Sequence, residues 1–144
     1  KSEAQFREFR YGLLNQWKME WSQELGQPVG IALAHHADDL LETRLIRMIR
    51  GTGLQGLQAM TLYDKGILRP LIYLNANEIR NYAHQQKIEW LEDPSNQNGD
   101  YLRNWLRNQW LPLLEQRHSG AIKNLSRSLS LIANQMRENL EALN

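Results

Sequence analysis

The chain has 144 residues, a formal net charge of +1 at pH 7 and no cysteine; 42% of its residues are hydrophobic and 23% are charged. This is the size and balance of one globular domain with a real core. The absence of cysteine excludes disulfides and thiolate metal sites, and no stretch approaches the apolar length of a membrane span. We therefore expect a cytoplasmic protein. The small net charge excludes an overall positive potential that would attract nucleic acid. Arginines cluster at 44–50 and 103–107, however, so local binding of phosphate is an open interpretation.

The N-terminal part predicts a helix followed by a strand. Residues 2–25 are expected to form an amphipathic packing helix that Gly26 ends. Its apolar residues at helical spacing are Phe6, Phe9, Leu13 and Trp17. The apolar run Val29–Ala34 lacks polar alternation, which is typical of a central parallel strand covered on both faces.

Only one other good strand candidate is found, Ile67–Tyr73, and its Pro70 argues against full pairing. One strand and part of another do not make a sheet. We therefore expect this chain to be the latter part of an α/β domain whose earlier strands lie outside it.

Between the two strand candidates, a helix over 39–50 is predicted to end at the turn Gly51–Leu57. The turn has Gly-x-Gly-x-x-Gly spacing, but it follows a helix, so we interpret it as a chain reversal and not as a dinucleotide fingerprint. Asn75 and Glu78 predict a capping box that opens a further helix. That helix is expected to carry Ile79, Tyr82 and Ala83 inward.

A turn-rich loop over 90–96 precedes a helix that begins at Tyr101 and that Pro112 ends or kinks. Its apolar side is predicted to hold Leu102, Leu106 and Trp110, with Arg103 and Arg107 on another side. The tail from Ala121 has a three-four apolar rhythm, which predicts a docking seam for a neighbouring helix or a partner. The seam residues are Ile122, Leu125, Leu129, Ile132 and Met136.

The chemistry is concentrated in His35–Thr43, where the first predicted strand meets the 39–50 helix. Reactive groups of open α/β sheets lie at such junctions. Helical geometry assigns residues of the 39–50 helix to two faces. One face holds Asp39, Glu42, Thr43 and Arg50, and the opposite face holds Leu41, Leu45 and Met48. We therefore expect the carboxylates to point away from the packing side. A purely structural alternative is that Asp38 and Asp39 cap the helix. Capping explains Glu42, which lies one turn further on, less well.

Three interpretations of this cluster compete: a metal site, a site for a cationic or nucleotide substrate, and a general acid/base site that uses histidine. The metalloprotease signature needs two histidines four residues apart with a glutamate between them, and the order here is His-His-x-x-Asp-x-x-Glu. The residues favour the second and third interpretations and name no reaction.

The stretch Ala34–Thr43, followed by Arg50–Leu57 and Met60, resembles the central motif of the tRNA(Ile)-lysidine synthase family, a group of N-type ATP pyrophosphatases. Other segments keep the family's order and spacing. They are Glu3–Leu14, the Arg-Pro-Leu segment within Ile67–Leu71, the Pro-Ser-Asn loop Glu92–Asn96, and the helix Tyr101–Asn104 with Arg107 and Leu111–Leu114. The family's pyrophosphate-cradling Ser-Gly-Gly-x-Asp-Ser loop is absent from this sequence.

By this resemblance, the chain is the C-terminal part of a Rossmann-like, adenine nucleotide alpha hydrolase-like α/β domain, and it is mostly helical. Residues 1–74 would be the latter part of the catalytic domain, and residues 75–144 a helical extension with a linker helix. The phosphate-binding loop would lie before Lys1, so we expect this fragment to be inactive alone.

The resemblance implies an ATP-dependent ligase that joins free lysine to C2 of the wobble cytidine of tRNA(Ile) with a CAU anticodon, through an adenylated tRNA intermediate. ATP would bring Mg²⁺ on its phosphates, and a homodimer is left open. The implied catalytic residues are His36, Asp39, Glu42 and Arg107; the implied substrate-binding residues are His35, Asp38, Arg50 and Arg103. Asp39 and Glu42 would hold the ammonium groups of lysine, and no side chain is expected to bind a metal.

Two other classes of protein stay open. A non-catalytic helical module that binds tRNA or protein, with a motif that has lost its activity, would explain the arginine clusters and the heptad-like tail. A metal-dependent phosphohydrolase is weakened because the sequence has no adjacent His-Asp pair.

Overall fold

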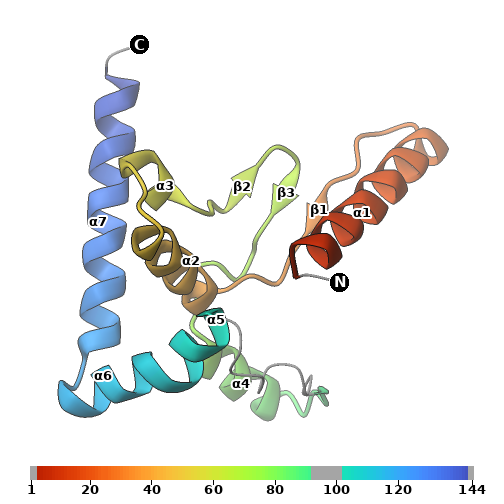
Figure 1. Cartoon of the computed structure of the whole chain (residues 1–144). Helices are drawn as coiled ribbons and strands as arrows, with labels where there is room; N and C mark the ends of the chain where they lie inside the picture. Colours follow the sequence, from red (N-terminus) through yellow and green to blue (C-terminus); the bar gives the residue numbers. More distant parts are fainter. Residues whose placement is uncertain (1–2, 92–101, 143–144) are drawn as a thin grey trace.

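The computed structural model describes residues 3–91 and 102–142 (Figure 1). The elements before the gap are α1 (Glu3–Leu25), β1 (Ile31–Ala32), α2 (Ala37–Ile49), α3 (Leu54–Gln58), β2 (Tyr63–Asp64), β3 (Ile67–Leu68) and α4 (Ala76–Gln85). After it come α5 (Leu102–Trp105), the π-helical turn η2 (Leu106–Trp110), α6 (Leu111–Arg117) and α7 (Ala121–Glu141). In these ranges, no helix is long and apolar enough to cross a membrane. Tyr101 and the part of the expected loop from 92 to 96 lie outside the described residues.

The sheet is small and has the strand order β1-β3-β2. Strands β1 and β3, which lie within the two expected strand segments, pair in parallel, with Ile31 opposite Ile67. Strand β3 ends at Leu68, before Pro70, as the proline indicated. Strand β1 lies at the edge of the described sheet, so the central position expected for it stays a prediction.

Strand β2 was not expected from the sequence. It pairs antiparallel with β3 through a tight turn at Lys65 and Gly66, both of which have positive φ. Two consecutive residues of positive φ give the turn that suits the right-handed twist of a hairpin. Lys-Gly is a weaker signal for this turn than Asn-Gly, so the sequence does not predict the hairpin.

Helix α1 forms as expected, but its apolar side chains do not pack. Phe6 and Phe9 are 59% and 67% exposed, and Trp17 is 49% exposed. Figure 1 shows α1 beside β1 and away from the other helices. The two-residue strand β1 is too small to cover a helix of 23 residues. The expectation of a packing helix is therefore wrong within the described residues.

The core lies where α2, the run from α5 to α6, and α7 meet (Figure 1). Its buried cluster consists of Leu41, Leu45, Leu106, Leu111 and Leu129, with Leu102, Trp110, Ile122 and Leu125 packed against it. These residues confirm the apolar sides expected for the three helical segments. Met48 is 48% exposed, because it lies in the last turn of α2 beyond the reach of this cluster.

Helix ends follow the expected chemistry except at Pro112. Gly51 ends α2 with φ of 75°, and the Asn75–Glu78 capping box opens α4. Pro112, however, does not end a helix. It occupies one of the first positions of α6, where its missing N–H is tolerated. Within α4, Tyr82 is 61% exposed, so its inward placement is wrong, whereas Ile79 and Ala83 are partly buried.

The docking seam of α7 is confirmed, and other helices of the same chain pack on it. Helix α7 packs on α3, α2 and α6, and Leu129 is 3% exposed. Ile132 is 43% exposed, so it lies outside the seam, while Ala133 is buried in it. A small alanine in the seam lets α3, a five-residue helix absent from the expectations, approach α7 closely.

Candidate active site

The polar cluster is built on the N-terminal turn of α2. His36 is the N-cap residue, and its backbone N–H donates a hydrogen bond of 3.0 Å to Oδ2 of Asp39. The Nε2 atom of His36 lies 3.5 Å from the same oxygen. Asp39 therefore caps its own helix, as the capping interpretation expected, and it also places a carboxylate beside the imidazole.

Asp38 is linked to a different helix. Its Oδ2 accepts a hydrogen bond of 2.9 Å from the backbone N–H of Ala76, the first residue of α4. The N–H of Ala37 donates to the carbonyl of Leu74 at 2.8 Å. Because N–H groups at a helix N-terminus have no partner within the helix, Asp38 satisfies one of them in α4. It thereby fixes the N-terminal ends of α2 and α4 side by side.

Glu42 and Asp39 share one arginine. Arg107 donates to the two Glu42 oxygens at 2.6 and 2.8 Å and to Oδ1 of Asp39 at 2.8 Å. Glu42 is fully buried, so the expectation that it points away from the packing side is wrong. The segment α5–η2 covers that face of α2 and brings Arg107 onto it.

Arg103 extends the same cluster. Its Nη2 donates to Oγ1 of Thr43 at 3.1 Å, and its Nε lies 4.0 Å from a Glu42 oxygen. Two arginines of one helical segment thus face two carboxylates of α2. The structure brings together Asp39, Glu42, Arg103 and Arg107, with His36 at the edge of the group.

The environment of this cluster sets its charges. Burial raises the pKa of Glu42 above its ordinary value, while the hydrogen bond and charge of Arg107 oppose that rise. Burial acts to lower the pKa of Arg107, but Glu42 and Asp39 outweigh it and raise that pKa. Arg107 is therefore a permanent cation that holds the two carboxylates in place.

His35 lies half-buried just before the cap. Burial lowers its pKa below 6.5, an effect that Asp39 opposes and Arg69 reinforces. In the described ranges, Nδ1 of His35 and Nδ1 of His36 have no hydrogen-bond partner. A buried ring nitrogen without a partner is suited to accept from or donate to a ligand.

Arg50 is not part of this cluster. It is the C-cap residue of α2 and is exposed. Eight residues of helix separate it from Glu42, which is about 12 Å along the axis. No described contact joins Arg50 to this cluster, so its implied role in substrate binding stays a prediction.

Within 3–91 and 102–142, no three histidine, aspartate or glutamate side chains are grouped so as to hold a metal ion. Asp39 and Glu42 are already engaged by Arg107, so their oxygens are not arranged as ligands.

Two contacts of the site could not be predicted from the sequence. Thr43, which was placed on the polar face of its helix, accepts from Arg103, and Ala76 offers only its backbone. Both depend on contacts between distant segments. Arg44 is buried, although the arginine cluster at 44–50 suggested a surface open to phosphate, and Arg69 is buried as well.

A short parallel pair of strands that leads into a helix with a polar N-terminus defines an α/β domain of the Rossmann-like class. A family model described as PP-loop domain matches residues 1–114. The chain belongs to the PP-loop domain family, which confirms the predicted fold class and the resemblance noted from the motifs.

The curated relatives carry one name. The chain is 47% identical over 136 residues to the tRNA(Ile)-lysidine synthase of Bdellovibrio bacteriovorus, covering 94% of this chain and 42% of the relative. It is 41% identical to the tRNA(Ile)-lysidine synthase of Francisella philomiragia, covering 80% of this chain and 30% of that protein. The chain thus spans less than half the length of these relatives.

A solved structure supports the fold. The chain aligns with a U34-tRNA thiolase from Methanococcus maripaludis with a TM-score of 0.59 and 18% identity, covering 88% of this chain and 43% of the thiolase. At this identity the likeness concerns the fold alone.

Proposed function

We propose that this chain carries the lysine-accepting part of a tRNA(Ile)-lysidine synthase, a cytoplasmic ligase that uses ATP. The reaction would adenylate C2 of the wobble cytidine in tRNA(Ile) with a CAU anticodon and then join lysine there. The names of the relatives support the enzyme class. The observation that carries the proposal is the Asp39–Glu42–Arg107 group at the N-terminal end of α2.

The proposed reaction has two balanced steps. The C2 carbonyl oxygen of cytidine attacks the α-phosphorus of ATP, and pyrophosphate leaves. An amine of lysine then attacks C2, AMP leaves with the former carbonyl oxygen, and the amine loses a proton. A cationic substrate and a proton to remove both call for carboxylates or imidazole beside the acceptor site.

The burial of the side chains divides the roles. We assign contact with lysine to Asp39, Asp38 and His36, whose side chains are 14%, 34% and 20% exposed. Glu42 is 1% exposed and would act as a positioning residue through Arg107. Arg107, at 34% exposed, would in addition face the phosphate of the adenylate, with Arg103 beside it. His35 would contact the nucleotide through its unpartnered Nδ1.

Other parts of the enzyme are proposed to lie outside this chain. The sequence contains no Ser-Gly-Gly-x-Asp-Ser loop, so the ATP phosphates and their Mg²⁺ would be held elsewhere. Residues 1–74 would then complete the catalytic domain and residues 75–144 extend it. A homodimer is compatible with this division, and the 144-residue chain alone would not form lysidine.

The test measures lysidine formation by the complete product of the gene that encodes this chain, with a tRNA(Ile) transcript, ATP and labelled lysine. Asp39→Asn is expected to lower the rate about a hundredfold. Asp64→Asn, in the exposed strand β2, is the matched control and keeps the wild-type rate. A wild-type rate in the Asp39 variant contradicts the assignment. Binding of tRNA without any lysidine formation by the wild type would favour the non-catalytic module.

A further inference from the structure

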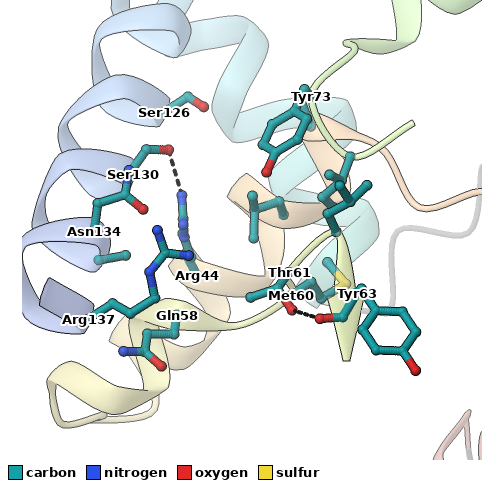
Figure 2. A pocket seen from close by; sticks show the side chains of 15 residues that line it. Arg44, Gln58, Met60, Thr61, Tyr63, Tyr73, Ser126, Ser130, Asn134 and Arg137 are labelled. Atoms are coloured by element: carbon teal, nitrogen blue, oxygen red, sulfur yellow. Dashed lines mark hydrogen bonds between the residues drawn. The ribbon is translucent and has the colours of Figure 1, made fainter. Parts of the chain in front are cut away.

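A second polar site lies on the other side of α2. A pocket of about 510 Å³ is enclosed by α2, the segment from α3 to β2, the turn at Ile72 and Tyr73, and α7 (Figure 2). It shares no lining residue with the Asp39–Glu42–Arg107 group. The pocket therefore needs an explanation of its own, which does not depend on the proposed function.

The wall of this pocket contains a buried cation without a carboxylate partner. Arg44 is 5% exposed, and its Nε donates to the carbonyl of Leu57 at 2.8 Å. Its Nη1 donates to Oγ of Ser130, also at 2.8 Å. Across the described residues, no aspartate or glutamate forms an ion pair with Arg44 or lines the pocket.

This arrangement favours an anion. Burial lowers the pKa of Arg44, and no neighbouring negative charge opposes that effect. A desolvated guanidinium gains most from a bound anion, and only two of its five N–H groups are used by the described residues.

Helix α7 adds neutral hydrogen-bonding groups. Ser126, Ser130 and Asn134 recur every four residues, so they lie on one face of the helix. Figure 2 shows them along one side of the pocket, with Arg137 following on the same helix. Hydroxyl and amide groups beside a guanidinium match the several oxygens of a phosphate better than the single negative edge of a carboxylate.

An aromatic ring stands at the opposite wall. Tyr73 lines the pocket across from α7 and is 76% exposed. Stacking on a tyrosine face is available to any nucleobase. We propose that this pocket binds the phosphate group of a nucleotide, with Arg44 and the α7 groups on the phosphate and Tyr73 beside the base or sugar. The nucleotide is either free or part of an RNA strand.

The test uses calorimetric titration of the complete gene product with inorganic phosphate, with AMP, and with a short RNA oligonucleotide that lacks terminal phosphates. Asn134→Asp places a negative charge in the pocket and is expected to raise the dissociation constant about tenfold. Asn124→Asp, on the same helix but outside the pocket, is the matched control. Arg44→Gln should weaken binding equally, and Arg80→Gln, an exposed arginine outside the pocket, should leave binding unchanged.

Each outcome decides the proposal. If Asn134→Asp weakens the binding of phosphate and AMP but not of the oligonucleotide, the ligand is a free nucleotide. If the variant weakens the binding of the oligonucleotide, the ligand is part of an RNA strand. Arg44 is buried and its variant can fail to fold, which circular dichroism detects, but Asn134 is exposed and keeps the test valid. If none of the three ligands binds more weakly to Asn134→Asp than to Asn124→Asp, the proposal is overturned.

Discussion

Arg107 in η2 donates two hydrogen bonds to the carboxylate of Glu42 in α2, at 2.6 and 2.8 Å, across 65 residues of sequence. The pair lies beside the leucine core, where Glu42 is fully buried. It therefore both attaches the C-terminal helices to α2 and sets the position of Asp39, which receives the remaining bond of Arg107.

The first prediction concerns the stability of this pair. Arg107→Met leaves Glu42 buried without its cation, so we expect the free energy of unfolding to fall by about 3 kcal/mol in urea titrations. Arg103→Met is the control, because the 4.0 Å approach of Arg103 to Glu42 and its hydrogen bond to Thr43 are weaker contacts, which predict a smaller loss of about 1 kcal/mol. Equal losses in the two variants would show that the Arg107–Glu42 pair contributes no more to the free energy of unfolding than the contacts of Arg103.

The second prediction concerns the pKa of Glu42. Since burial raises this pKa and Arg107 opposes the rise, Arg107→Met is expected to raise it further. Carbon-13 NMR titration of the Glu42 carboxyl measures the shift. The carboxyl of Glu115 is an internal reference, because its pKa is lowered by the N–H groups of Ile122 and Gly120 and Arg107 is not among the causes of that shift. An unchanged or lower pKa of Glu42 would contradict this account.

Local patterns and long-range contacts differ in how well the sequence predicts them. The helical spacing of Leu41 and Leu45, and the Asn75–Glu78 capping box, depend on residues within two turns, and both are confirmed. The face assignment of Glu42 is wrong because an arginine 65 residues away supplies its partner. A polar residue on a helix is expected to face water unless a distant charge is known to meet it.

The pocket around Arg44 was hidden for the same reason. Arginine at this position follows the motif and suggests an exposed basic surface, yet the carbonyl of Leu57 and the hydroxyl of Ser130 bury it. Ser130 is 86 residues away, and the apolar rhythm of α7 predicts its packing side without indicating a partner for Arg44.

The third prediction concerns acid sensitivity. Because the pKa of His35 is lowered in the folded chain, the unfolded chain binds the proton more tightly. The stability from neutral His35 is fully present above pH 6.5, the ordinary value, and is lost as pH falls through the folded pKa. His35→Asn should therefore reduce the fall in unfolding free energy between about pH 7.5 and 5.5. The exposed His118→Gln serves as control, and a wild-type slope in His35→Asn would refute the prediction.

The fourth prediction concerns the link between α2 and α4. Asp38→Ala removes the acceptor for the N–H of Ala76, so we expect a loss of about 1 kcal/mol, since the side chain is partly exposed. Hydrogen exchange at the Ala76 amide should become faster. Asp38→Asn keeps an oxygen acceptor and should restore most of the protection. Unchanged exchange at Ala76 in Asp38→Ala would mean that the bond does not hold the two helices together.

The fifth prediction opposes helix propensity to packing at Gly56 in α3. Alanine normally stabilises a helix interior by about 1 kcal/mol relative to glycine. A Cβ at Gly56, however, would lie 1.7 Å from Oγ1 and 2.9 Å from Cβ of Thr52. Gly56→Ala is therefore expected to destabilise the protein by about 1–3 kcal/mol in thermal unfolding, with partial recovery in the double variant that adds Thr52→Ala. Gly12→Ala in α1, where nothing lies within 4 Å, should instead stabilise, and stabilisation by Gly56→Ala would show that Thr52 moves aside at little cost.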